Sequence, residues 1–282
     1  MPEAKAQILI FDGAMQFGDA IYEVTAVADG RMLNFSPHMR RLERSGTAID
    51  PEGLPSFADL EHIHAQLIRR KQLRDGLVYL QVSRGSNGDR DYYFRKETAL
   101  TVILFTQSKP GFLDMGDAHP GLHVQLVPDH RWARCDIKST QLLWPVLAKQ
   151  RASNAGFDDA WFVQDGVVTE GTTNNAGIVL DGKVVTHPTG DNILAGTARA
   201  SLVSVATALG MDAEERPFTV EEINDAEEAF ITSSMNILVP VTRIDAKRVG
   251  NGTVGPSILA LQAEMLSQMK AGCEVDAANS VP

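Results

Sequence analysis

Residues 131–143, RWARCDIKSTQLL, place Lys138 in a charged segment that also holds Arg131, Arg134 and Asp136. The segment follows an apolar run that is typical of a strand, so this lysine lies where regular structure is expected to end. Neighbouring cations and partial burial lower the pKa of a lysine, and an uncharged amine can form a bond to a carbonyl group. The pattern indicates a lysine that holds a cofactor covalently, and a lysine on a solvated loop is the alternative.

The composition limits the class of protein. The chain has 282 residues, of which 44% are hydrophobic and 22% charged, as in ordinary soluble proteins of one or two domains. The net charge of -10 argues against non-specific binding of nucleic acid, which needs a positive field. No apolar run approaches the roughly 20 residues of a membrane helix. Cys135 and Cys273 are too few and too far apart for a disulfide framework or a zinc site, so we expect a cytoplasmic protein.

The first part of the chain alternates between strand and helix patterns. Two strands are predicted on either side of a turn at Asp29-Gly30, and Ser36 is expected to cap the helix that follows. An amphipathic helix and two further strands complete this part, over 56–73, 77–85 and 100–105.

The stretch TQSKPGFLDMGDAHPG (106–121) is rich in proline and glycine and has little apolar periodicity, so it predicts a linker. After it the chain shows strands with Asp-Gly turns at 165–166 and 181–182, and helices that end at Gly156 and just before Gly210. Its last residues resemble a frayed tail. We therefore predict an α/β fold with mixed sheets and two domains, over 1–107 and 121–282, joined by a linker over 108–120.

The stretch VTEGTTNN (168–175) places Glu170 at the end of an apolar strand, followed by Gly171 and small polar residues. A glycine lets the backbone approach a ligand closely, and a carboxylate in this position can keep a ring nitrogen protonated. A polar hairpin turn is the alternative.

The stretch NILAGTAR (192–199) predicts a turn at Gly196 and Thr197 that opens a helix. The free N–H groups at a helix start bind phosphate well, and Arg199 is expected to add a bidentate contact. Ser233 and Ser234, in ITSSMN (231–236), can add hydroxyl donors to the same anion. Plain N-capping by Thr197 is the alternative.

The seven histidines form no metal-binding or catalytic motif, and no metal site is expected. His38, in SPHMRRL, is assigned to the chemistry of a helix start.

These stretches occur together, and in this order they resemble the class IV pyridoxal-phosphate aminotransferases. The likeness is greatest to the D-amino acid aminotransferases within that family. RWARCDIKSTQLL followed by VLAKQRA carries most of it, and QFGDAIYEV, HMRRL, VSRGSNGDRDYYF, VTEGTTNN and ILAGTAR fall in family order. The resemblance covers almost the whole chain. It implies fold type IV, with a smaller N-terminal α/β domain and a larger, barrel-like C-terminal domain with helices.

The resemblance assigns roles to particular residues. Lys138 is similar to the Schiff-base lysine, which also moves the substrate proton, and Glu170 to the partner of the pyridinium nitrogen. The family's contacts to the phosphate and ring of pyridoxal 5'-phosphate fall on Arg41, Leu194, Gly196, Thr197, Ala198, Ser233 and Ser234. The substrate carboxylate is expected to meet Tyr22, Arg90 and Tyr92. Because the family completes this carboxylate trap across an interface, the resemblance also implies a homodimer.

The sequence departs from the family pattern at Gly13-Ala14-Met15, where an arginine-glycine-aromatic step is usual, and at Tyr92, where histidine is common. Ala198 also replaces a common threonine. We expect a transaminase that moves the amino group of a D-amino acid, such as D-alanine, to a 2-oxo acid by ping-pong kinetics, with side activity on (R)-amines. A lyase of the aminodeoxychorismate type, an (R)-amine transaminase and a non-catalytic anion-binding dimer are the alternatives.

Overall fold

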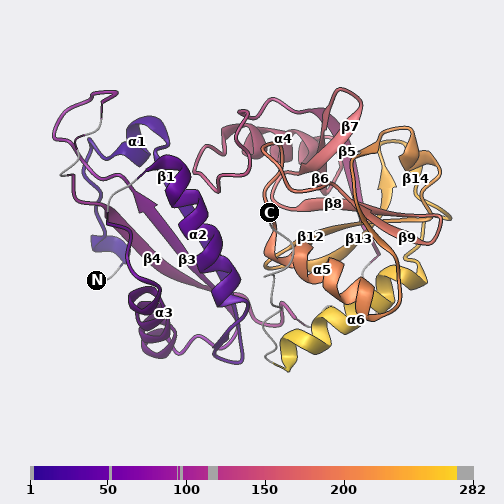
Figure 1. Cartoon of the computed structure of the whole chain (residues 1–282), viewed down its shortest axis with the longest axis horizontal. Coiled ribbons are helices and arrows are strands. Elements are labelled where there is room, and N and C mark those ends of the chain that lie inside the picture. Colours follow the sequence, from indigo (N-terminus) through magenta and orange to yellow (C-terminus); the bar gives the residue numbers. More distant parts are fainter. Residues whose placement is uncertain (1–2, 51–52, 94, 96–97, 114–119, 272–282) are drawn as a thin grey trace.

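The computed structural model describes residues 3–50, 53–93, 95, 98–113 and 120–271. Its N-terminal half is built on a four-stranded antiparallel sheet in the order β2-β1-β3-β4 (Figure 1). β1 and β3 pair along their whole length, from Ala20 opposite Ser83 to Val27 opposite Gly76. The strands are β1 (Ala20–Ala28), β2 (Arg31–Met32), β3 (Gly76–Ser83) and β4 (Thr101–Ser108).

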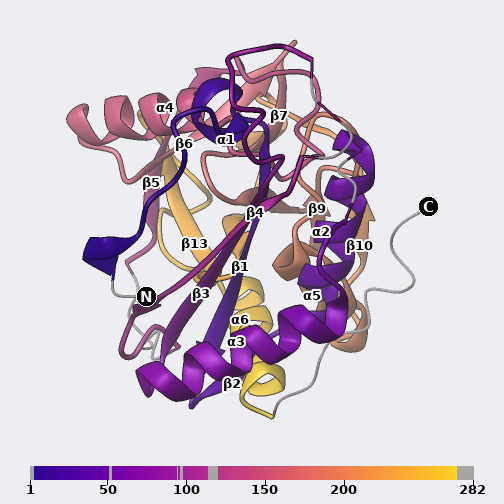
Figure 2. The ribbon, with the colours of Figure 1, turned by 90° about the vertical axis from the view of Figure 1, so that its left-hand side faces the viewer.

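Two helices, α2 (Phe35–Ile49) and α3 (Phe57–Lys71), pack on one face of this sheet (Figure 2). Alternate residues of the strands point to that face, where Ile21 and Leu80 contact apolar residues of both helices, such as Phe35 and Leu60. The amphipathic pattern therefore decides which face of the sheet is covered. A short helix, α1 (Gly13–Phe17), precedes β1.

The C-terminal half is built on a larger mixed sheet in the order β10-β9-β8-β12-β13-β5-β6-β7-β11, with β14 beside β13. β7 and β8 also contact each other although five steps of the order separate them, so the sheet curls round. Its strands are β5 (Leu122–Pro128), β6 (Asp159–Gln164), β7 (Val167–Gly171), β8 (Asn175–Leu180), β9 (Lys183–Thr186), β10 (Ala213–Glu215), β11 (Phe218–Thr219), β12 (Glu228–Ser233), β13 (Ile237–Ile244) and β14 (Lys247–Arg248).

Three helices accompany the curled sheet: α4 (Leu143–Asn154), α5 (Thr197–Ala208) and α6 (Pro256–Lys270). α5 and α6 pack on each other and on β12 and β13, where Leu202 and Leu261 are fully buried. A second core, with Trp161 against Phe218, gathers side chains from strands all round the sheet. These apolar layers leave the ends of β7 and β12 free to carry polar residues.

The predicted turns at Asp29-Gly30, Asp165-Gly166 and Asp181-Gly182 are confirmed, since the backbone there has positive φ at both residues. The expected cap at Ser36 is wrong, because α2 begins at Phe35 after Asn34, a residue type that tolerates the left-handed conformation seen there. The helix predicted to end at Gly156 is confirmed as α4, which ends at Asn154. The sequence patterns predict neither α1 nor α6.

The predicted linker, 108–120, lies between the two sheets in the chain, since β4 ends at Ser108 and β5 begins at Leu122. Residues 114–119 of it, and the tail from 272, are outside the described residues. The division into two domains therefore stays a prediction. Among the described residues, no helix is long and apolar enough to cross a membrane.

Candidate functional site

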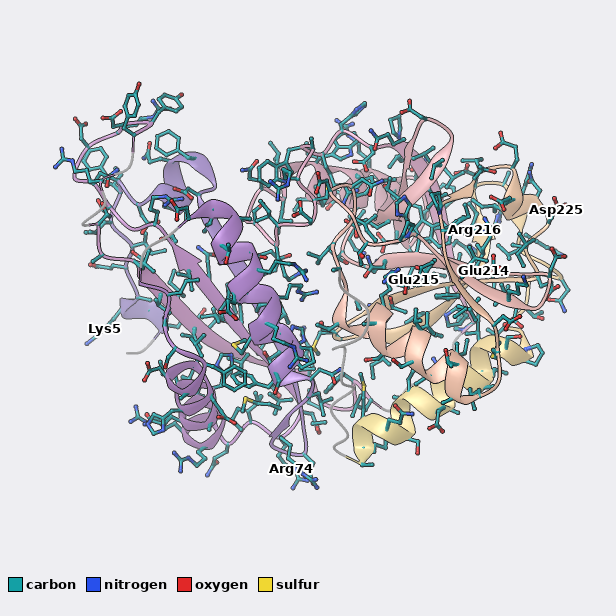
Figure 3. The ribbon with its side chains drawn as sticks, viewed as in Figure 1. Lys5, Arg74, Glu214, Glu215, Arg216 and Asp225 are labelled. Atoms are coloured by element: carbon teal, nitrogen blue, oxygen red, sulfur yellow. The ribbon has the colours of Figure 1, made fainter. Side chains whose placement is uncertain are left out.

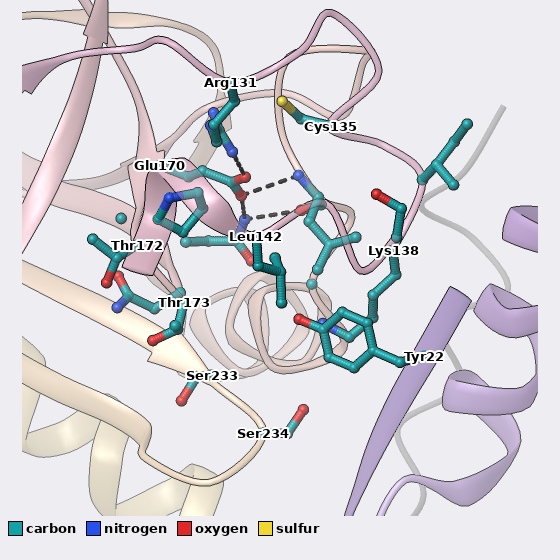
Figure 4. Close-up of a pocket in the computed structure, with 18 of the residues that line it drawn as sticks. Tyr22, Arg131, Cys135, Lys138, Leu142, Glu170, Thr172, Thr173, Ser233 and Ser234 are labelled. Atoms are coloured by element: carbon teal, nitrogen blue, oxygen red, sulfur yellow. Dashed lines mark hydrogen bonds and ion pairs between the residues drawn. The ribbon is translucent and has the colours of Figure 1, made fainter. Parts of the chain in front are cut away.

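A cavity of about 790 Å³ opens between the two halves of the molecule (Figure 4). Tyr22 and Arg41 reach it from the N-terminal half, whereas Glu170 and Ser233 reach it from the curled sheet. Of the residues expected to catalyse or to hold the cofactor, all but Arg199 line this one cavity. The structure thus gathers residues that are up to about 210 positions apart in the chain, from Tyr22 to Ser234.

Lys138 lies on a segment that pairs with β1. The N–H of Tyr22 donates to the carbonyl oxygen of Lys138 at 2.9 Å, and the N–H of Thr140 donates to Ala20 at 3.0 Å. On the other side, the N–H of Lys138 donates to the hydroxyl of Ser45 at 3.2 Å. Its Nζ is 4.3 Å from the centre of the Tyr22 ring. The backbone of the lysine is therefore fixed, and its amine projects into the cavity (Figure 4).

Both arginines that neighbour Lys138 in the sequence form ion pairs with carboxylates, and their effect on Lys138 stays a prediction. Only 8% of the Arg131 side chain is exposed, and it pairs with Asp129 and Glu170. Arg134 makes two hydrogen bonds of 2.9 Å to Asp136. A guanidinium matches a carboxylate in such a fork, so these ion pairs fix the orientation of both arginines.

Glu170 is the next-to-last residue of β7 and accepts hydrogen bonds on both carboxylate oxygens. Arg131 donates to Oε1, and Oε2 accepts from the Asn175 amide at 2.9 Å and from the Leu194 N–H at 3.0 Å. Burial raises the pKa of Glu170 to about 7, although Arg131, the Leu194 N–H and Lys138 act in the opposite direction. The polar hairpin turn is not the whole description, because this acid is buried and faces a cavity. Sequence reasoning did not find the roles of Arg131 and Asn175.

The start of α5 lies on the same cavity. α5 begins at Thr197 after Gly196, so Thr197 is not its N-cap. The first N–H groups of this helix belong to Thr197 and Ala198, both of which line the cavity together with Ser233 and Ser234. Arg41 braces the turn from the other half of the molecule by donating to the carbonyl oxygen of Ala195 at 3.0 Å. The arrangement suits an anion.

Arg199 does not take the phosphate-binding position that the sequence suggested. Its side chain is buried and donates to the carbonyl oxygen of His187 at 3.0 and 2.7 Å and to Glu215 at 2.5 Å. Glu215 lies on β10, beside Glu214 and Arg216 in the C-terminal half (Figure 3). Arg199 therefore points away from the cavity into a structural ion pair.

Arg41 belongs to a buried group of three residues, together with Glu23 and His38. Glu23 accepts two hydrogen bonds of 2.7 Å from Arg41 and one of the same length from the His38 ring. Burial alone would raise the pKa of Glu23, but Arg41 and His38 hold it well below its usual range. His38 Nε2 also lies 3.4 Å from the Ser234 hydroxyl. The assignment of His38 to helix-start chemistry is wrong, since its ring links Glu23 to the cavity wall.

Arg90 and Tyr92 do not line this cavity. Tyr92 lines a neighbouring cavity of about 1160 Å³, which shares Trp132, Ser139 and Gln141 with the first. The Arg90 guanidinium lies 5.1 Å from the centre of the Phe17 ring and 5.3 Å from that of Tyr92. Both residues are exposed in this single chain. Their role in binding substrate stays a prediction.

Comparisons with known proteins agree with this geometry. The family described as "Amino-transferase class IV" matches residues 20–244. A D-alanine aminotransferase of Bacillus licheniformis is 34% identical over 273 residues, which cover 95% of each chain. One of Listeria monocytogenes serotype 4b is 31% identical over 268 residues, covering 95% of this chain and 93% of the relative.

Solved structures share the fold. A branched-chain amino acid aminotransferase of Escherichia coli superposes with a TM-score of 0.90 at 20% identity, over 98% of this chain and 94% of that one. One from T.th., solved with pyridoxamine 5'-phosphate, gives 0.87 at 21% identity over 97% and 92%. A putative 4-amino-4-deoxychorismate lyase of Legionella pneumophila gives 0.83 at 23% identity over 94% and 96%. The predicted fold is confirmed, and the chain belongs to the class IV aminotransferases, enzymes that depend on pyridoxal 5'-phosphate.

Proposed function

We propose that this enzyme transfers the amino group of a D-amino acid, such as D-alanine, to a 2-oxo acid by a ping-pong mechanism. One observation carries the proposal: a lysine amine, a buried carboxylate and a helix start face one cavity. Lys138, Glu170 and the turn at Gly196 come from three separate segments, so their convergence is not a consequence of local sequence.

The cavity suits pyridoxal 5'-phosphate. The N–H groups that open α5, the Ser233 and Ser234 hydroxyls and Arg41 would hold its phosphate. Gly196 leaves room beside the turn, since a Cβ there would lie 1.9 Å from Asn175 Oδ1. Leu194 would pack against the ring. When bound, this cofactor supplies an electron sink for the substrate carbanion.

In the proposal, Lys138 would hold the cofactor. Once released, its amine is the base that takes the proton from the substrate Cα and returns it to the carbon of the cofactor. Glu170 keeps the ring nitrogen protonated. A cationic ring beside Glu170 would lower the pKa of its carboxyl from about 7, so that the acid and the ring share one proton favourably. The hydrogen bonds from Arg131 and Asn175 favour the ionised carboxylate.

The choice of a D-amino acid rests on the relatives named D-alanine aminotransferase and on the residues of the expected trap. Tyr22 is in the cavity, whereas Arg90 and Tyr92 lie outside it in one chain. We propose a homodimer in which a second copy brings Arg90 and Tyr92 to the site. A guanidinium binds a carboxylate through two parallel hydrogen bonds, which would favour amino acids over simple amines. We also propose that the enzyme is cytoplasmic.

A lyase of the aminodeoxychorismate type is the second candidate, because the Legionella structure shares this fold. At 23% identity that likeness concerns the fold alone. An (R)-amine transaminase is a further alternative, because Tyr92 stands where histidine is common. A transaminase and a lyase differ in the substrates that they need for repeated turnover. A transaminase releases a 2-oxo acid once per cofactor and needs a second 2-oxo acid to continue, whereas a lyase turns over without it.

A half-reaction scan tests the proposal. The enzyme loaded with pyridoxal 5'-phosphate would be mixed with D- and L-alanine and with both enantiomers of 1-phenylethylamine, and the cofactor absorbance followed. We expect rapid conversion with D-alanine and slow conversion with the (R)-amine. Steady release of pyruvate by elimination from 4-amino-4-deoxychorismate, without an added 2-oxo acid, would instead indicate the lyase, and preference for the (R)-amine would reject the D-amino acid assignment.

Two variants make the scan specific. Lys138→Ala should abolish the conversion, whereas Lys183→Ala, which removes an exposed lysine paired with Glu214, should leave it unchanged. Arg90→Ala should raise KM for D-alanine by about tenfold or more while changing that for the amine little, because only D-alanine has a carboxylate. Equal effects on both substrates would remove Arg90 from the trap.

A further inference from the structure

Asn175 touches two parts of the site at once. It is the first residue of β8 and is buried, with 5% of its surface exposed. Its Nδ2 donates to Glu170 Oε2 at 2.9 Å and to the carbonyl oxygen of Leu194 at 2.8 Å. Both protons of one amide group are therefore used, one on the acid of β7 and one on the turn before α5.

The oxygen of the Asn175 amide also lies close to the turn, at Gly196. A Cβ added to Gly196 would lie 1.9 Å from Asn175 Oδ1, so the backbone of the turn rests directly against this side chain. The N–H of Leu194 closes the group by donating to the same oxygen of Glu170 at 3.0 Å. Asn175 itself is fixed by β-sheet pairing with Thr232 on β12.

These contacts join two sites that the proposed function uses for opposite ends of the cofactor. Glu170 is assigned to the ring nitrogen, and the turn at 194–196 opens the helix assigned to the phosphate. We propose that Asn175 is a positioning residue that sets the ring-nitrogen site and the phosphate site relative to each other. This inference rests on the proposed function, because that function supplies the roles of Glu170 and of the turn. Asn175 itself is assigned no contact with the cofactor.

The chemistry of the side chain supports this assignment. Only an amide offers two donors here without adding charge, and an aspartate of the same size would place a second carboxylate against Glu170. The charged groups that already act on Glu170 are Arg131, Lys138 and Arg41, and the Cys135 thiol is also close enough to interact. Like charge at position 175 would oppose the balance that these groups set.

The test compares Asn175→Ala and the isosteric Asn175→Asp with the wild-type enzyme. One readout is the ratio of affinities for pyridoxal 5'-phosphate and for pyridoxal, which lacks the phosphate and so reports on the phosphate site. The other is the pH at which the absorbance of the bound cofactor titrates, which reports on the ring site. Asn154→Ala, at the exposed end of α4, is the matched control.

We expect both Asn175 variants to lower the preference for the phosphorylated form by about tenfold, the typical effect of a lost hydrogen bond in a buried site. They should also shift the titration by about one pH unit, and Asn175→Asp should shift it further than Asn175→Ala. Glu170→Gln keeps an acceptor oxygen for the turn, so it should move the titration while the affinity ratio stays within about twofold. The control should change neither readout.

Three results would overturn the inference. A change in the titration with an unaltered affinity ratio would mean that Asn175 serves Glu170 alone. An altered ratio with an unchanged titration would mean that it serves only the turn. A lower melting temperature with both readouts unchanged would make Asn175 purely structural. Failure of the proposed function would be distinct, because borohydride would then trap no pyridoxal adduct on Lys138 of the wild-type chain.

Discussion

The N–H of Tyr22 donates to the carbonyl oxygen of Lys138 at 2.9 Å, so the N-terminal end of β1 holds the proposed cofactor lysine in place. β2 pairs only with Val27 and Ala28 at the far end of β1, which leaves this end free on one side. Segment 138–140 occupies that side, with Ser139 opposite Ile21. A strand of the first sheet thus positions a lysine that comes after the first strand of the second.

Glu23→Gln should destabilise the protein by about 3–5 kcal/mol, because Arg41 would remain buried with its main ionic partner removed. Urea unfolding of the cofactor-free protein would measure this. Glu43→Gln, at an exposed glutamate on the helix that carries Arg41, is the control and should change the free energy of unfolding by less than about 0.5 kcal/mol. Similar values for the two variants would contradict a structural role for the Glu23 pair.

Glu170 should make the cofactor-free protein less stable as the pH rises from about 4.5 to about 7. Burial raises the pKa of Glu170 to about 7 from an ordinary value of 4.5, so over this range the unfolded chain loses the proton first. The cost is absent below pH 4.5 and complete above pH 7, where it amounts to about 3 kcal/mol. The free energy of unfolding of Glu170→Gln, minus that of the wild type, should rise across this window. Parallel stability curves would rule out the raised pKa.

Mixed dimers test whether the substrate trap is shared between subunits. Lys138→Ala and Arg90→Ala chains would be unfolded together, refolded and assayed with D-alanine and a 2-oxo acid. If Arg90 serves the partner's site, each mixed dimer contains one complete site, and activity should return to about a quarter of the wild-type value from random pairing. If Arg90 serves its own chain, the mixture shows no more than the residual activity of the Arg90→Ala parent when D-alanine is kept well below its KM.

Gly196→Ala should weaken the binding of pyridoxal 5'-phosphate and cost about 1–3 kcal/mol of stability, because its Cβ would lie 1.9 Å from Asn175 Oδ1. Equilibrium titration and thermal unfolding would measure the two effects. Gly190→Ala is the control from the same loop, since the nearest atom to its Cβ would be 3.5 Å away. Equal tolerance at both positions would show that the turn can relax.

Much of the site was predictable because its chemistry is written in short segments. Glu170 and the turn at Gly196 stand at the ends of regular elements, and Lys138 stands in the irregular segment between β5 and α4. All three have polar or small neighbours, which can be seen in the linear sequence. Their convergence on one cavity follows from the topology of the curled sheet, which the periodicity of the chain did not specify. The family resemblance supplied that step.

The errors have a common physical cause, which is competition between partners distant in sequence. In the sequence, Arg199 looks like an anion ligand and Arg131 like a cation that acts on Lys138, yet Glu215 and Glu170 pair with them in the fold. Glu23 and His38 gave no signal because they are 15 residues apart and on different elements. A buried ion pair forms only where the fold brings two elements together, so it cannot be predicted from either residue alone.

The contact between Tyr22 and Lys138 has a consequence for how activity depends on shape. In the proposed reaction, the amine that moves the proton is on a segment held by hydrogen bonds to β1 of the N-terminal half, whereas the acid that tunes the ring lies on the curled sheet. A small shift of one half relative to the other would change their separation directly, even with every side chain intact. Substitutions between the two halves but outside the cavity should therefore slow turnover before they weaken binding.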